Sequence, residues 1–153
     1  MDYRAQRNRK QQQKDRFYMY TACLAVLSAS LPLMPFSLLY PDRKVFIYLP
    51  GILFWVGLIG TIITAVRMAR TARKDQHRDD LHPNGASIGL FHFFENKPAC
   101  VFDVLMLVSL VGLVVTRIWA GTTLWPFVFL PILTFSFGMH CMLNGSSYRY
   151  IQL

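Results

Sequence analysis

Four apolar segments, each long enough to cross a bilayer as an α-helix, occupy most of this chain. Four such segments in 153 residues leave too little polar sequence to enclose a water-soluble core. The hydrophobic share of 54% also exceeds the roughly 45–50% that is typical of soluble proteins. We therefore predict an all-α, polytopic membrane protein whose single membrane domain covers residues 1–153, with transmembrane helices over 17–39, 45–66, 99–119 and 125–143.

The connections between these segments predict how the helices lie next to one another. Residues 40–42 are Tyr-Pro-Asp and residues 120–123 are Ala-Gly-Thr-Thr, and both sequences are typical of tight turns. Because a short turn forces consecutive helices to lie side by side, we expect an antiparallel four-helix bundle. Pro32 and Pro35 should kink the outer half of the first helix.

The distribution of Lys and Arg predicts the orientation, since positively charged segments are retained on the cytoplasmic side of the membrane. Thirteen of the 16 basic residues lie in the N-terminal segment, in the central loop or in the tail, and only Arg43, Lys44 and Arg117 lie in or next to the two short connections. We therefore expect both termini to be cytoplasmic (N-in/C-in).

The polar segments are assigned from the same pattern. We expect a flexible basic N-terminus over 1–16, a cytoplasmic loop over 67–98 whose first part continues the second helix, and a cytoplasmic tail over 144–153. Within the loop, the apolar residues 88–94 fit either a segment lying in the membrane interface or a strand-like loop packed beneath the bundle. The basic face should attract anionic lipid, whereas no aromatic residues interleave with the basic run as nucleic-acid binding would require.

The second half of the chain carries a resemblance. The sequence FFENKPACVFD, followed by an apolar segment and then by HCMLNGSSYRYI, resembles a group of small, uncharacterised four-span membrane proteins of Gram-positive bacteria. The resemblance covers roughly residues 88–151. It implies a bacterial plasma-membrane location and the same topology, and it implies no activity, cofactor or site residue.

Candidate functional residues are polar groups placed where apolar ones would be less costly. Asp103 lies 17 residues before Ala120, and His140 lies 16 residues after Leu124, so two helices joined by a short turn bring these side chains to nearly the same depth. The same counting predicts that Cys100 is level with Asn144 and that Cys141 lies beside His140.

Three interpretations of this polar layer remain open. Asp103 and His140 could bond to each other and hold two helices together, with the cysteines as small packing residues. They could instead form a substrate-binding or proton-linked site, because imidazole titrates near neutral pH. A Cys/His/Asp metal site is the third, although the spacing lacks the usual ligand pattern.

Two helices also carry small residues at helical spacing. Gly57 and Gly60 share a face of the second apolar segment, and Gly112 and Thr116 do so on the third. Such faces allow close helix packing, either within one chain or between copies in a homo-oligomer.

No catalytic motif, cofactor motif or metal-ligand set stands out, so we expect a structural or accessory membrane protein with a protein partner rather than an enzyme. The alternative is a homo-oligomeric small-solute or proton-linked carrier or channel that uses Asp103 and His140.

Overall fold

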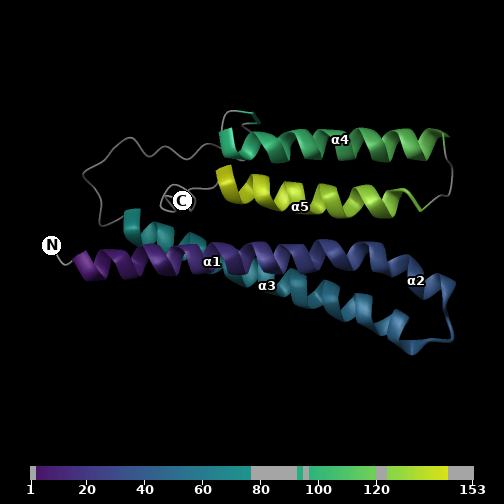
Figure 1. The fold of residues 1–153 in the computed structure, drawn as a ribbon, viewed down its shortest axis with the longest axis horizontal. Helices are drawn as coiled ribbons and strands as arrows, with labels where there is room; N and C mark the ends of the chain where they lie inside the picture. The colour runs from purple at the N-terminus through teal and green to yellow at the C-terminus, as the bar shows by residue number, and fades with distance from the viewer. Residues whose placement is uncertain (1–2, 77–92, 95–96, 120–123, 145–153) are drawn as a thin grey trace.

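The computed structural model describes residues 3–76, 93–94, 97–119 and 124–144, and within these ranges it contains helices and no strand (Figure 1). The elements are α1 (Tyr3–Ser30), the 3-10 turn η1 (Leu31–Leu33), α2 (Met34–Leu39), α3 (Lys44–Gln76), α4 (Lys97–Trp119) and α5 (Pro126–Asn144). The all-α prediction is confirmed over the described residues.

Four stretches of helix are long and apolar enough to cross a membrane. They are Gln11–Leu39, Lys44–Thr71, Lys97–Trp119 and Pro126–Asn144. The first three contain the apolar segments predicted from the sequence, and the fourth is shifted by one residue from the predicted 125–143. The chain therefore has the character of a multi-pass membrane protein.

The first span is interrupted at the predicted place. The regular hydrogen bonding of α1 ends at Ser30, η1 contains Pro32, and α2 restarts the helix with Pro35 in its first turn. Proline has no amide hydrogen and its ring collides with the preceding turn of a helix, so two prolines three residues apart force this break. The Tyr40 amide closes α2 by donating to the Phe36 carbonyl at 3.0 Å.

The N-terminal segment differs from the expectation. Residues 1–16 are predicted to be flexible, whereas the structure has α1 begin at Tyr3, fourteen residues before the apolar segment. The segment contains no Gly or Pro and is rich in Gln, Lys and Arg, which are good helix formers. The Gln11 side chain also donates to Asp15 one turn later, at 3.2 Å. The apolar part of α1 continues directly from this segment and supplies the helix nucleus, which an isolated basic peptide would lack.

The central loop is helical at its beginning, as expected, because α3 continues ten residues beyond the predicted end of the second span, to Gln76. Residues 88–92 of the predicted interfacial segment and most of the predicted tail, 145–153, lie outside the described residues.

Glycines let the helices pack closely within this chain. A Cβ added at Gly57 of α3 would lie 2.5 Å from the Leu27 backbone nitrogen of α1, and one at Gly60 would lie 2.7 Å from the Cys23 sulfur. On α4, a Cβ at Gly112 would lie 2.5 Å from the Phe129 ring of α5. The small-residue faces predicted from the sequence are therefore intramolecular contact surfaces.

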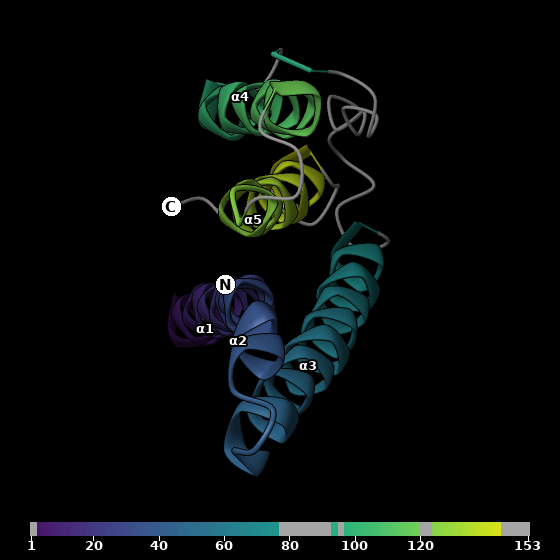
Figure 2. The same ribbon diagram turned by 90° about the vertical axis from the view of Figure 1, so that its right-hand side faces the viewer.

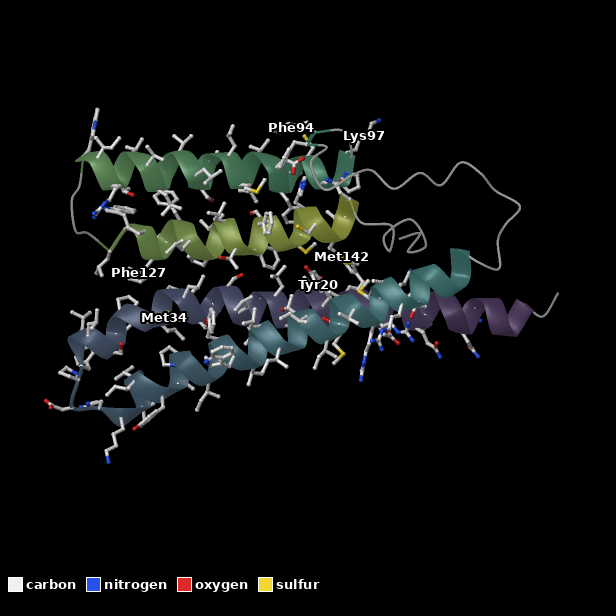
Figure 3. All side chains as sticks on the ribbon, turned by 180° about the vertical axis from the view of Figure 1, so that it is seen from behind. Tyr20, Met34, Phe94, Lys97, Phe127 and Met142 are labelled. Carbon is white, nitrogen blue, oxygen red and sulfur yellow. The ribbon has the colours of Figure 1, made fainter. Side chains whose placement is uncertain are left out.

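The helices form two pairs that meet through α1 and α5. Helix α3 packs along α1, α4 packs along α5, and α5 in turn contacts α1 and η1. Seen along the helices, α3 and α4 stand at the two ends of the arrangement (Figure 2). The Tyr20 hydroxyl of α1 connects the pairs by donating to the Gly138 carbonyl of α5 at 2.9 Å (Figure 3).

The tightest packing is concentrated at one end of the molecule. Its buried apolar side chains come from the middle of α1, the later part of α3, the start of α4 and the end of α5, namely Phe17, Tyr20, Leu24, Leu27, Met68, Ala99, Met139, Met142 and Leu143. Two polar side chains that the sequence singles out, Asp103 and His140, are buried at the same end.

Candidate functional site

Helix α4 brings Asp103 into the protein interior. The helix begins at Lys97, and Pro98 in its first turn lacks the amide hydrogen that would have no partner there. Ala99 and Asp103 are one turn apart and both are buried, whereas the intervening Val101 is exposed. Asp103 is 2% exposed, so its carboxylate depends on protein partners rather than on water.

Helix α5 presents three polar residues at successive four-residue intervals. Ser136, His140 and Asn144 therefore share one face, and all three are buried. His140 is completely buried, at 0% exposure. A polar stripe on one side of an apolar helix is stable in a membrane only if that side faces protein.

The two helices bring Asp103 and His140 into direct contact, which confirms the prediction that they lie at the same depth. His140 Nδ1 bonds to Asp103 Oδ1, and the second carboxylate oxygen accepts the backbone N–H of Phe94 at 2.8 Å. Both oxygens act as acceptors, so we assign a proton to His140 Nδ1. The pair links α4 and α5, and it links both to the chain just before α4.

Two side chains, Phe93 and Asn144, also pack against the imidazole ring of His140. The Phe93 ring stacks on it, with 4.5 Å between ring centroids and an interplanar angle of 17°. Asn144 Nδ2 lies 3.2 Å from His140 Nε2 and 3.3 Å from Nδ1. An atom nearly equidistant from both ring nitrogens must lie over the ring, since in the ring plane it would collide with Cε1. The amide therefore packs on the ring and restricts its rotation.

Phe94 adopts a backbone conformation that is uncommon for its residue type. Its φ of 64° is in the left-handed region, and it is the one described non-glycine residue with positive φ. This conformation directs its amide toward Asp103 while Phe93 covers His140. Figure 3 shows Phe94 folded back beside the first turns of α4. Residues 93–94 therefore contact both α4, through Asp103, and α5, through His140.

Of the other sequence candidates, the structure places Asn144 in contact with the pair. Cys100 and Cys141 are half-buried free thiols. Asn144 packs on His140 from the next turn of α5. No group of three His, Cys, Asp or Glu side chains that could hold a metal ion occurs in the described part of the chain.

Sequence reasoning missed Phe93, Phe94 and Ser136. The two phenylalanines belong to an aromatic run before α4, and nothing in that run distinguishes a residue that contacts His140 from one that faces lipid. Ser136 could have been found, because it precedes His140 by one helical turn. Its hydroxyl is buried and, within the described residues, has no hydrogen-bond partner.

The Asp103 carboxylate and the His140 imidazole thus bond to each other inside the protein. A carboxylate holding a histidine Nδ1–H fixes the position and tautomer of the ring, which suits either a structural clamp or a proton-transfer group. Comparisons of the chain with protein-family models, curated proteins and solved structures find no match.

Proposed function

We propose that this protein is a non-enzymatic accessory protein of a bacterial plasma membrane, built as an antiparallel four-helix bundle with both termini in the cytoplasm. The observation that supports an accessory role is the enclosure of Asp103 and His140. Each is almost fully buried and bonded to the other, with Phe93 and Asn144 against the ring. A carrier must expose its binding groups to water in turn, whereas these groups stabilise the contact between two helices.

The outer helices supply the surface for a partner. Along α3, Ile52 and Val56 lie about one helical turn apart and are 59–60% exposed, and Trp55 beside them is 60% exposed. Lipid can cover such a face, and so can a helix of another membrane protein, which would use large side chains such as Trp as contact points. We propose that α3 provides this contact.

The accessory role predicts a specific partner. A tagged protein purified in mild detergent should retain one integral membrane protein in a constant ratio, and Trp55→Ala should reduce that ratio several-fold without changing helix content, because a central aromatic contact is lost. Trp119→Ala is the matched control, since Trp119 is 87% exposed on α4. Equal recovery of every membrane protein from both variants would contradict a specific partner.

A second candidate function is proton-linked transport, and Ser136 favours it. A buried hydroxyl without a partner among the described residues, one turn from His140, is a group that a solute or water could bond. In liposomes containing the purified protein, this function requires a proton flux that Asp103→Asn abolishes. The accessory role predicts no flux in either protein.

The orientation predicts the outcome of chemical labelling. Single cysteines at Lys44 and at Asp80, in a background lacking Cys23, Cys100 and Cys141, should differ in reactivity toward a membrane-impermeant maleimide applied to whole cells. We expect at least about tenfold stronger labelling at position 44, because basic residues are concentrated on the side of position 80. Labelling of both positions in permeabilised cells is the control. The reverse pattern in whole cells would invert the topology.

A further inference from the structure

We propose that the crossing of α1 and α3 at their basic ends binds the headgroup phosphate of an anionic phospholipid, with Arg16 and Arg67 as its principal contacts. This inference rests on the membrane insertion proposed above. It assigns a defined site on folded helices, distinct from the general attraction of lipid to the basic N-terminal segment.

The position of Arg16 is fixed by α3. Its Nη1 donates to the Thr71 hydroxyl, and that hydroxyl donates to the Arg67 carbonyl at 2.9 Å. Closer to the middle of the spans, Gly57 and Gly60 allow α3 to touch α1 at Leu27 and Cys23. The guanidinium of α1 is therefore held against the turn of α3 that also carries Arg67.

The positive charges at this crossing have no acidic counterpart among the described side chains. The described carboxylates are Asp15, which accepts from Gln11, Asp42 in the turn at the other end of the pair, and Asp103, which bonds His140. Like charges held close together repel, and an anion placed between them removes that repulsion. A phosphate is a suitable anion for this position, because guanidinium groups bind its oxygens in bidentate fashion.

The neighbouring surface identifies the anion as a lipid. Ile59, Ile63 and Val66 follow one face of α3 at helical spacing, are 43–52% exposed, and lead directly to Arg70 on the same face. Arg67 and Arg70 are themselves exposed. An apolar strip that ends in basic residues matches an acyl chain joined to a phosphate. A soluble phosphate would contact only the basic residues.

The test is native mass spectrometry of the purified full-length protein in mild detergent, titrated with dioleoyl phosphatidylglycerol or with dioleoyl phosphatidylcholine. We expect phosphatidylglycerol to bind more tightly. Arg67→Gln should weaken its binding about tenfold, and Arg16→Gln should do the same, because each removes a charge-assisted contact. Arg67→Lys should give an intermediate loss, since charge remains and the bidentate geometry does not. Arg117→Gln, in the last turn of α4, is the control and should bind as the wild type does.

Arg67 is the deciding position if Arg16→Gln disturbs folding, because the Arg67 side chain is exposed. Unchanged phosphatidylglycerol binding by a folded Arg67→Gln variant, or equal binding of both lipids by the wild type, would overturn the site. Displacement of the lipid by inorganic phosphate at the same concentration would overturn the choice of a lipid. Release of the wild-type protein from membranes by alkaline carbonate would instead overturn membrane insertion, which separates the two failures.

Discussion

Replacement of His140 by leucine should lower the free energy of unfolding by about 3–5 kcal/mol, the usual cost of leaving a buried carboxylate without its partner. Leucine fills much of the space but removes the imidazole from the buried Asp103 carboxylate, which keeps its hydrogen bond from the Phe94 amide. The measurement is thermal or denaturant unfolding in detergent, followed by circular dichroism. His140→Asn should lose less, because an amide can still donate to the carboxylate.

Two further variants separate loss of the pair from loss of packing. The double variant Asp103→Leu/His140→Leu should regain part of the stability, because no uncompensated charge remains in the interior. Thr134→Val is the control on the same helix, since the Thr134 hydroxyl donates at 2.8 Å to the Leu130 carbonyl of its own helix. If His140→Leu unfolds no earlier than Thr134→Val, the pair does not stabilise the fold.

Replacement of Gly57 by alanine is expected to destabilise the protein, because overpacking typically costs about 1–3 kcal/mol and a clash with backbone belongs at the upper end of that range. The added Cβ would lie 2.5 Å from the Leu27 nitrogen and 2.7 Å from its Cα. These are backbone atoms, so relief requires α1 and α3 to move apart. The intrinsic gain of about 1 kcal/mol from alanine in a helix offsets only part of the cost.

Gly51→Ala is the matched control for this change. Gly51 lies on the same helix, and nothing lies within 4 Å of a Cβ added there, so this variant should be as stable as the wild type or more stable. Gly60→Ala should have an intermediate effect, because its new methyl meets a cysteine side chain rather than backbone. Equal unfolding temperatures for the Gly57 and Gly51 variants would contradict the close contact of α1 with α3.

Features that depend on helical periodicity and on helix length could be predicted from the sequence. The depth of Asp103 and His140 followed from the constant rise of a helix and from the short turn between two spans. The glycine faces followed from spacing along α3 and α4, and the break in the first span followed from Pro32 and Pro35.

Features that depend on tertiary contacts could not be predicted in this way. The left-handed conformation of Phe94 has no sequence signal of its own. The Asp103 carboxylate stabilises this conformation by accepting the Phe94 amide, and that contact exists only once α4 has formed. The polar composition of residues 3–16 alone predicts a flexible segment. The segment is helical because the apolar helix that continues from it supplies the helix nucleus. The packing of Asn144 on His140 depends on a rotamer that spacing alone does not specify.

The pairing of the helices has a consequence for biosynthesis. Helices α1 and α3 are consecutive spans, so their interface can form in the bilayer before α4 and α5 leave the ribosome. Helix α5 emerges after the others and supplies both His140 for Asp103 and the carbonyl that accepts from Tyr20. Until then, the Asp103 carboxylate is a charge without its imidazole in a newly inserted helix. The docking of α5 therefore forms the Asp103–His140 pair and the Tyr20 hydrogen bond in a single event.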